Sequence, residues 1–592
     1  MAPRTLVAAL SLLAHRAASA ALNTTTSANP TATSASPSGP PTISNTDYSA
    51  EALDYLWSLV GDVTPDQHST TVLPDPAVAT GFSSPAARPL HPFVPSYDAS
   101  LSGLVLPAGF GWGVASSAYQ IEGAARAEGK GPSVWDFLTH QTGYVADGTT
   151  GDNVAEHYWL YKEDIARLGA LGVPSFSPSF SWPRFFPFGK GPVNEEAVAH
   201  YDDVIATMRE YGVQPDVTLF HWDTPLALVY EYGAWNSPQI VDDFFEYAKF
   251  VISRYDEHVH TWFTINEPQY CNWQWSGYPV SELWPSFEDV PAAGSGLESR
   301  FLCGHYSLLA HAKVAKWYHE EFKGQGRISF KNSGNYYESY TNSTADLEAR
   351  QRWFDFTIGW FGGPWREDGD YPQSLKDTLG DLLPTFTEEE KEMIKGSCDF
   401  YALDGYTSYY VWASDTSEEC IADPTTPGFP ECANSGQTNP DGFPLGPSGD
   451  PGVSWLTSAP SGIRRFLNYI TKELHPSVPD IQVTEFGFAE PFESQKTDIN
   501  SVLWDLRRAE YYQGYLDNIL MAIHYDNVNV TGALGWAIFD NFEWGSGVSV
   551  RFGMQYVDYD SLERTPKASL FQFLNWFKEH PVGGSTNATM VI

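Results

Sequence analysis

The chain has 592 residues, of which 15% are aromatic, and it carries a formal net charge of −39 with a pI of about 4.6. So acidic a protein repels nucleic acid and anionic membranes, which excludes both as partners. Its 21 tryptophans and 32 tyrosines suit the stacking of sugar rings, but the same residue types also build hydrophobic cores. Composition alone therefore leaves a sugar-related function and an aromatic core equally open.

Residues 1–20 have the pattern of a secretory signal peptide. Arg4 supplies the positive charge, residues 6–14 form a short apolar run, and residues 18–20 read ASA, a small-residue cleavage site. The apolar run is too short to cross a bilayer, and no later segment reaches the roughly eighteen uncharged apolar residues that a span needs. We therefore expect a secreted, extracellular protein without a membrane span.

The rest of the chain divides by composition. Residues 21–100 are rich in Ser, Thr and Pro and should form a mostly disordered extension, apart from an amphipathic stretch over residues 50–60. Residues 101–580 have the mixed composition of one large folded domain, and residues 581–592 should be a flexible tail.

The five cysteines are Cys271, Cys303, Cys398, Cys420 and Cys432, so at least one is unpaired. Cys420 and Cys432 flank a short stretch rich in Pro and Gly and are the expected disulfide. The chain has no CxxC or His-rich spacing, so we expect no metal site and no cofactor. Four sequons are candidate glycosylation sites in a secreted protein, at Asn23, Asn342, Asn529 and Asn587.

Within residues 101–580, short β-prone runs alternate with amphipathic segments. The eight runs are Gly109–Ala118, Val173–Ser181, Asp216–His221, Thr261–Asn266, Arg327–Asn332, Phe400–Tyr406, Asp480–Glu485 and Ala533–Phe539. The helix-prone segments include Lys162–Leu171, Ala197–Tyr211, Ile240–Tyr255, Tyr306–Phe322, Leu347–Phe361, Ile463–Leu474 and Ala509–Ala522. The alternation predicts an α/β fold, a (β/α)8 TIM barrel, and the uneven spacing predicts long decorating loops.

Active sites of such barrels lie at the carboxyl ends of the strands. Two of the predicted strands end in a lone carboxylate, Glu267 and Glu485. A pair of carboxyls about 5 Å apart is what retaining glycosidases use, one as acid and base and the other as nucleophile. The sequence therefore predicts a glycosidase site at the mouth of the barrel.

The motifs around these residues resemble glycoside hydrolase family 1, the β-glucosidase family, and in particular its secreted, fungal-type members. Residues 264–268 read TINEP where the family has TFNEP, and residues 483–487 read VTEFG where it has ITENG. Residues 110–123, FGWGVASSAYQIEG, match the family's N-terminal signature. Residues 536–544, WAIFDNFEW, resemble WSLLDNFEW, and the resemblance covers about residues 104–575.

The resemblance implies a retaining β-glycosidase, most often a β-glucosidase, that removes terminal non-reducing glucosyl residues by double displacement. Glu267 would be the general acid and base, and Glu485 the nucleophile. The residues that would bind the sugar are Gln120, His221, Asn266, Tyr406, Trp536, Glu543 and Trp544. A carboxylate such as Glu543 accepts bonds from two hydroxyls and would repel a 6-phosphate, which favours a neutral sugar. Without the motifs, Trp536 reads equally well as barrel core and His221 as a structural histidine.

The chain departs from the family pattern near the nucleophile. Ser177 stands where the family has an arginine that contacts the nucleophile, Asp404 replaces an asparagine, and Phe486 replaces the asparagine after the nucleophile. Pro178 also removes a backbone donor inside a strand. Loss of the cation disfavours ionised Glu485, and a protonated carboxyl cannot attack. Lys331 is the nearby residue that could replace the missing charge.

These departures leave two alternatives beside hydrolysis: a catalytically weakened sugar-binding protein of the same fold, and a transglycosidase. The aglycone pocket would be lined by residues 273–284 and the insertion at 411–458, whose sequences do not specify a substrate. Glu122, which ends the N-terminal signature, is expected to cap a helix or form a salt bridge. The expected partner is a small-molecule or oligosaccharide β-glycoside, and nothing in the sequence indicates an oligomeric state.

Overall fold

The structure is a computed structural model that describes residues 47–75, 94–272 and 296–583. The predicted signal peptide, the sequons Asn23 and Asn587, residues 273–284 and most of the predicted tail lie outside the described residues. The sequons Asn342 and Asn529 are both exposed.

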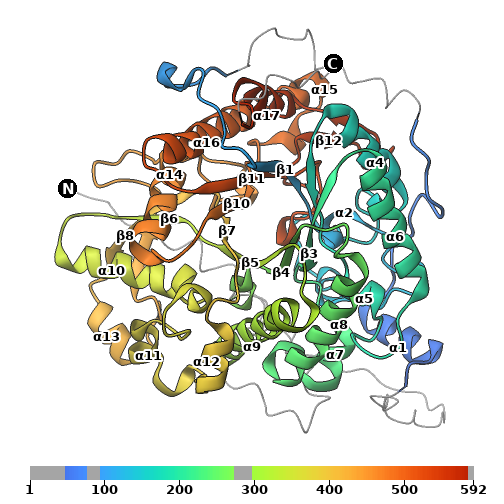
Figure 1. Cartoon of the computed structure of the whole chain (residues 1–592), viewed down its shortest axis with the longest axis horizontal. Helices are drawn as coiled ribbons and strands as arrows, with labels where there is room; N and C mark the ends of the chain where they lie inside the picture. The colour runs from blue at the N-terminus through green and yellow to red at the C-terminus, as the bar shows by residue number, and fades with distance from the viewer. Residues whose placement is uncertain (1–46, 76–93, 273–295, 584–592) are drawn as a thin grey trace, which may run out of the picture. The chain divides into compact units, whose positions relative to one another are not determined.

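Eight parallel strands close into a barrel, as the sequence predicts (Figure 1). Around the barrel they follow the order β1-β11-β10-β7-β5-β4-β3-β2, which is the chain order of the eight strands. Their bounds are β1 Gly111–Ala115, β2 Ser175–Ser177, β3 Gln214–Phe220, β4 Thr261–Asn266, β5 Arg327–Ser333, β7 Tyr401–Asp404, β10 Ile481–Phe486 and β11 Val530–Trp536.

A helix packs outside the barrel after each strand, because each carries an apolar face that the sheet covers. These helices are α4 His157–Leu171, α6 Glu195–Glu210, α8 Gln239–Tyr255, α9 Gly296–Trp317, α10 Thr344–Phe354, α14 Pro460–Tyr469, α16 Leu506–His524 and α17 Ala568–Glu579. One-turn π-helices extend three of them, at Tyr318–Phe322, Asp355–Gly359 and Ile470–Leu474.

The predicted decorating loops form small elements of their own. The largest is a three-stranded sheet of β6 Tyr336–Ser339, β8 Ser408–Ala413 and β9 Ala433–Gly436, and β12 Gln555–Val557 pairs with β13 Arg564–Pro566. Short helices fill the remaining loops: α2 Ala118–Ile121, α3 Val134–Thr139, α5 Trp182–Phe185, α7 Leu226–Tyr232, α11 Gln373–Leu379, α12 Glu388–Ile394, α13 Ser417–Ala422 and α15 Ile499–Leu503.

Strand β2 is only three residues long, against nine in the predicted run Val173–Ser181. It stops at Ser177 because Pro178 has no backbone N–H for the ladder. The chain stays beside β3 through the Pro178 carbonyl, which accepts from Thr218 N at 3.0 Å, and a bridge between Ser179 and Thr218. The barrel is thus complete but weakly paired at this strand.

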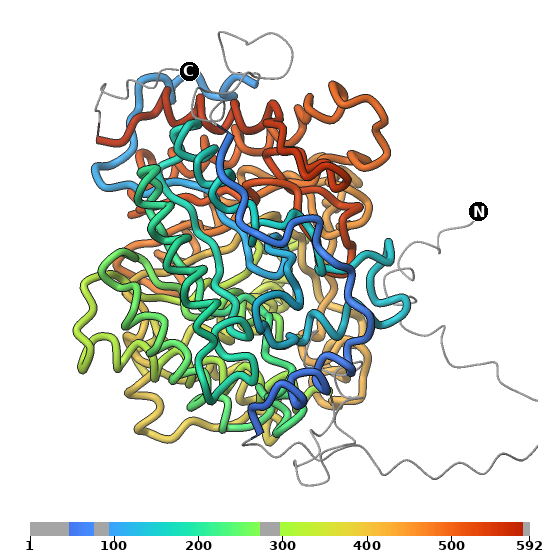
Figure 2. The backbone as a smooth tube through the Cα atoms, turned by 90° about the vertical axis from the view of Figure 1, so that its right-hand side faces the viewer, coloured from blue at the N-terminus to red at the C-terminus, as the bar shows by residue number. Residues whose placement is uncertain are grey.

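Residues 47–75 lie within the segment expected to be mostly disordered, yet they are placed against the barrel. Helix α1, Ala50–Val60, covers the stretch predicted to be amphipathic, and it is the blue helix at the base of Figure 2. It buries Leu56 and Trp57, and Trp57 Nε1 donates to the Lys130 carbonyl at 3.0 Å. The expectation of disorder therefore needs correction for this part, because the apolar face of α1 has a partner on the barrel domain.

The predicted disulfide between Cys420 and Cys432 is present, with the two Cα atoms 5.6 Å apart. Cys271 and Cys303 form a second disulfide, which leaves Cys398 as the unpaired, buried cysteine that the odd count requires. Among the described residues, no helix combines the length and apolar character needed to cross a membrane.

Candidate active site

The predicted functional side chains gather at the carboxyl ends of the barrel strands. Glu267 directly follows β4, Glu485 is the last residue but one of β10, and Tyr406 comes two residues after β7. Trp536 ends β11, and the loop after it carries Glu543. Segments far apart in the sequence therefore meet because parallel strands share one mouth.

These residues border a cavity of about 460 Å³. Seven of the nine predicted site residues line it: His221, Glu267, Tyr406, Glu485, Trp536, Glu543 and Trp544. The other two, Gln120 and Asn266, are fully buried directly behind the cavity wall.

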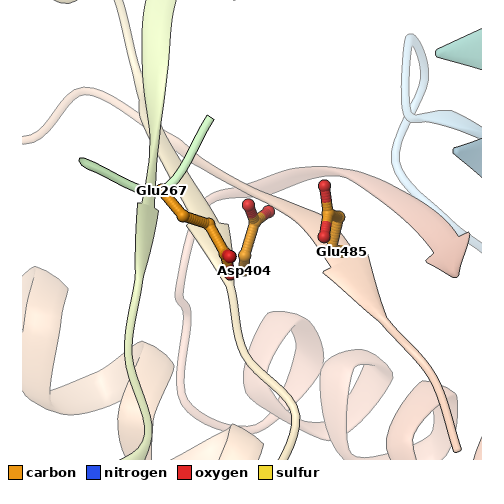
Figure 3. A group of neighbouring side chains, drawn as sticks. All are labelled: Glu267, Asp404 and Glu485. Carbon is orange, nitrogen blue, oxygen red and sulfur yellow. The ribbon is translucent and has the colours of Figure 1, made fainter. Parts of the chain in front are cut away.

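The two catalytic candidates face each other across this cavity. One carboxylate oxygen from each of Glu267, Asp404 and Glu485 lies within 4.8 Å of the other two, and Figure 3 shows the three side chains converging. Retaining glycosidases hold their carboxyls about 5 Å apart, whereas inverting enzymes need a wider gap for a water. The arrangement fits attack by a carboxylate rather than by a water. Three carboxyls could also ligate a metal ion, but an ammonium group already contacts this cluster.

That ammonium belongs to Lys331 on β5. Its Nζ donates to Glu485 Oε1 at 2.9 Å, and the Lys331 and Glu485 side chains are 1% and 4% exposed. The second oxygen of Glu485 accepts from the Tyr406 hydroxyl at 2.9 Å. Both oxygens of Glu485 thus accept a hydrogen bond, which fixes the rotation of the carboxylate.

Glu267 has a different environment. Burial, with the nearby charge of Glu485, raises its pKa to about 8, and these effects outweigh a hydrogen bond from Ser333. Some contact with solvent remains through the cavity, although protein surrounds the side chain on its other sides. Glu267 also has a left-handed backbone, φ 40°, where its N–H donates to the Lys331 carbonyl at 2.9 Å. A carboxylic acid protonated at neutral pH is what a general acid requires.

Two further carboxyls share this corner of the barrel. Burial and the charge of Glu485 raise the pKa of Asp404 well above its usual range and raise that of Glu543 to about 8. Asp404 Oδ1 accepts from Thr484 Oγ1 at 2.6 Å. Neutral acids therefore surround the ion pair that Lys331 forms with Glu485.

Aromatic rings form one wall of the cavity. The His221 ring lies between Trp536 and Trp544, each 5.8 Å away between centroids and within about 21° of parallel. Asn266 Nδ2 lies 3.2 Å from His221 Nε2, and Asn266 Oδ1 has no partner. Burial and Lys331 lower the pKa of His221 well below its usual range, so the ring is neutral.

Gln120 supports the wall from behind. Its Nε2 donates to the Phe542 carbonyl at 2.8 Å, and its Oε1 accepts from Ser117 Oγ at 2.6 Å. The loop that carries Glu543 is thus anchored to α2. In the structure Gln120 positions this loop, and its predicted contact with the sugar stays a prediction.

The departures from the family pattern have separate outcomes. Ser177 is buried with no partner for its Oγ, so β2 brings no cation to the nucleophile. Phe486 points away from the cavity and stacks on Tyr515 at 6.3 Å. Glu122 forms the expected salt bridge, since Arg184 Nε donates to it at 2.6 Å.

Several cavity residues were missed by the sequence reasoning. Trp222 directly follows the predicted run Asp216–His221 but had no role assigned, and Trp135 and Tyr144 come from segments with no motif. Trp455 is not such a miss, since it lies in the insertion 411–458 that was predicted to line the aglycone pocket. Ser333 and Asn335 were missed as well: β5 continues one residue beyond the predicted run, to Ser333, and Asn335 follows two residues later. The rule that polar residues end barrel strands would have found them had the strand been given its full length.

Comparison with known proteins agrees with this geometry. The sequence pattern of glycosyl hydrolase family 1 matches residues 104–580. The chain belongs to glycosyl hydrolase family 1. Beta-glucosidase 1B of Phanerodontia chrysosporium is 38% identical over 482 residues, which are 80% of this chain and 86% of the relative. Beta-glucosidase 4 of Oryza sativa subsp. japonica is 38% identical over 81% of this chain and 96% of its own, so relatives include fungal and plant enzymes.

Solved structures of family 1 members share the fold. A β-glucosidase from the fungus Humicola insolens, in complex with glucose, superposes with a TM-score of 0.74 at 34% identity and covers 81% of this chain and 99% of its own. A rice β-glucosidase variant in a covalent complex with Glc gives a TM-score of 0.73 at 33% identity, over 80% and 99% of the two chains. As a family 1 member, the chain is a glycoside hydrolase that acts on O-glycosyl bonds.

Proposed function

We propose that this protein is a retaining, exo-acting β-glucosidase that releases glucose from the non-reducing end of neutral β-glucosides. The observation that carries the proposal is the close approach of Glu267 and Glu485, within 4.8 Å, with the pKa of Glu267 raised to about 8, as suits a general acid. The complex of the Humicola insolens relative with glucose supports glucose as the sugar.

In the first step, a Glu485 oxygen attacks the anomeric carbon while the bond to the leaving oxygen breaks. Glu267 transfers its proton to that oxygen, so the aglycone leaves as an alcohol and a glucosyl ester remains on Glu485. Lys331 and Tyr406 aim the attacking carboxylate by holding one oxygen each.

In the second step, the same residue acts in reverse. Esterification removes the charge of Glu485, which is one of the two causes that raise the pKa of Glu267. Glu267 is then a stronger acid, stays ionised, and can take a proton from water. The water oxygen attacks the anomeric carbon and the ester bond breaks. β-Glucose is then released, and the Glu485 carboxylate is restored.

The sugar pocket suits an uncharged glycone. Glu543 and the rings of Trp536 and Trp544 line its closed end, where a carboxyl group can bond two adjacent hydroxyls. A phosphate there would meet up to four carboxyl groups and one ammonium, so we propose neutral sugars rather than sugar phosphates. The sugar-binding alternative drew on the missing arginine, and Lys331 now supplies a cation at Glu485.

The test follows the product rather than only the rate. Purified protein is given 4-nitrophenyl β-glucoside in an NMR tube, beside Glu485→Gln as the matched variant of nearly equal size. The proposal expects β-glucose as the first product and none from the variant. α-Glucose as the first product, or undiminished turnover by the variant, contradicts it. Excess alcohol in a parallel tube reports any transfer to an acceptor instead of water.

We also propose that the protein is secreted. Its first 20 residues have the pattern of a signal peptide, and disulfides such as Cys271–Cys303 persist mainly in oxidising compartments. Expression of the full chain in a eukaryotic host, followed by N-terminal sequencing of protein from the medium, tests this. Retention of an intact N-terminus inside the cells contradicts it.

A further inference from the structure

Lys331 touches both catalytic residues, in two different ways. Its carbonyl oxygen accepts from the Glu267 N–H at 2.9 Å, and its Nζ donates to Glu485 Oε1 at 2.9 Å. The side chain lies inside the barrel, with Nζ 5.2 Å from the centre of the Phe263 ring. A fully buried ammonium is costly unless a carboxylate offsets it, so its presence here requires an ionised partner.

Strand β2, which in the family pattern carries the arginine that contacts the nucleophile, brings no cation to Glu485 here. Ser177 occupies that position on β2, and its Oγ is buried without a hydrogen-bond partner. Lys331 lies on β5, three strands on from β2 around the barrel, between β4 and β7. The positive charge thus reaches Glu485 from the side of the acid/base residue instead of from β2.

We propose that Lys331 is a positioning residue for the nucleophile, which keeps Glu485 ionised and aimed in place of the arginine absent at position 177. This inference rests on the proposed function, since it assigns the means by which Glu485 serves as nucleophile. Lys331 acts through Glu485 and needs no contact with the sugar.

The surrounding charges make this assignment specific. The titratable groups described around Glu485 and Lys331 come from β3, β4 and β7, the loops that follow them, and the loop after β11; they are Asp216, His221, Glu267, Asp404, Tyr406 and Glu543. His221 is neutral, and each nearby carboxyl named here has a pKa above its ordinary value because of burial. Burial opposes the charge on Lys331, but the carboxyl groups around it, Glu485 first, outweigh burial and raise the pKa of the lysine.

Asp404 fits the same scheme. One ammonium offsets one ionised carboxylate, so the carboxyl that replaces the family's asparagine must stay neutral. Burial and Glu485 hold its pKa far above the usual range, and its Oδ2 has no partner. In its neutral form Asp404 has nearly the shape of the amide it replaces and does not compete with Glu485 for Lys331.

The experiment measures the attack of Glu485 directly. A 2-deoxy-2-fluoro-β-glucoside with a dinitrophenolate leaving group forms the glucosyl ester but hydrolyses slowly, and the good leaving group removes the need for proton donation. The rate of inactivation is followed from pH 3 to pH 8 for the wild-type protein, Lys331→Met, and the double variant Ser177→Arg/Lys331→Met. Mass spectrometry of peptides identifies the labelled residue.

Without the ammonium, we expect the acid limb of the inactivation rate to move up by roughly 1–3 pH units, since a nearby cation favours an ionised carboxyl by about that much. In the acid range the rate of Lys331→Met should then fall by roughly 10- to 1,000-fold, with a much smaller loss near pH 8. The double variant, which returns a cation to β2, should have its acid limb close to that of the wild type. Lys376→Met is the matched control, because Lys376 pairs with Asp370 at 2.7 Å outside the cavity, and its limb should not move.

An unmoved acid limb in folded Lys331→Met, or an equal loss at every pH, overturns the inference, since a merely structural lysine predicts the latter. Should Lys331→Met fail to fold, the double variant decides, because it keeps the charge: a wild-type limb supports the proposal and a uniformly low rate opposes it. Wild-type protein that is never labelled on Glu485 would instead refute the proposed function. The two failures are therefore distinguishable.

Discussion

The two glutamates that we propose as catalytic occupy similar places, at the carboxyl ends of β4 and β10, but have opposite surroundings. Glu485 has a donor on each oxygen, one of them an ammonium. Among the described residues Glu267 has no ion-pair partner, and burial together with the nearby charge of Glu485 raises its pKa to about 8. Under the proposed mechanism, the same type of side chain would serve as nucleophile at one position and as acid at the other, because the neighbouring groups determine which carboxyl holds the proton.

The strongest test of this contrast removes the nucleophile. Glu485→Gln keeps the shape of the side chain and one of its two acceptor oxygens but cannot form a stable ester. We expect kcat to fall on the order of 10⁵-fold for every leaving group. Hydrolysis of a series of aryl β-glucosides checks this. A loss confined to poor leaving groups would show that Glu485 is the acid and that the two roles are reversed.

Glu267→Gln should give the complementary pattern. We expect a loss of roughly 10²–10⁴-fold with alkyl glucosides, which need a proton, and a far smaller loss in the first step with dinitrophenyl glucoside. In the wild type, kcat/KM should fall as the pH rises through about 8, because Glu267 loses its proton there. That alkaline limb should disappear in Glu267→Gln. Its persistence would mean that another group, such as Glu543, controls it.

Tyr406→Phe probes the neutral donor on the nucleophile. Its hydroxyl bonds Glu485 Oε2 at 2.9 Å, and a bond to a charged group is worth about 1.5–3 kcal/mol. We therefore expect kcat/KM to drop roughly 10- to 100-fold. Tyr318→Phe is the control, because it removes a tyrosine–aspartate bond, to Asp256 at 2.9 Å, away from the cavity. Equal losses in both variants would contradict a specific role for Tyr406.

The smallest expected effect concerns stability. Burial and Glu485 raise the pKa of Glu543 to about 8, above its value in the unfolded chain. The folded state then holds this proton more tightly, so the free energy of unfolding decreases as the pH rises from about 4.5 to 8. Glu543→Gln should recover on the order of 1–3 kcal/mol at pH 8 and little at pH 4, seen as a higher melting temperature. The exposed Glu473→Gln should show no such difference, and equal curves for Glu543→Gln and the wild type would contradict the assignment.

The sequence predicts the barrel and most of its mouth because both depend on local patterns. The eight strands are periodic apolar runs, and Glu267 and Glu485 stand in motifs at their ends. Trp135 and Tyr144 carry no such pattern, since they reach the cavity by loop conformation alone. The sequence named Lys331 as a candidate, but its contact with Glu485 depends on the closure of the barrel. Closure brings β5 and β10 close enough for the Lys331 side chain to reach Glu485.

Helix α1 has a consequence for work with the isolated enzyme. The family match begins at residue 104, which invites recombinant expression from that point. Such a truncation would remove Trp57 from the surface around Lys130 and take the backbone donors of Thr64 and His68 away from the carboxylates of Asp152 and Glu156. Expression should therefore start upstream of Ser49, the residue that caps this helix.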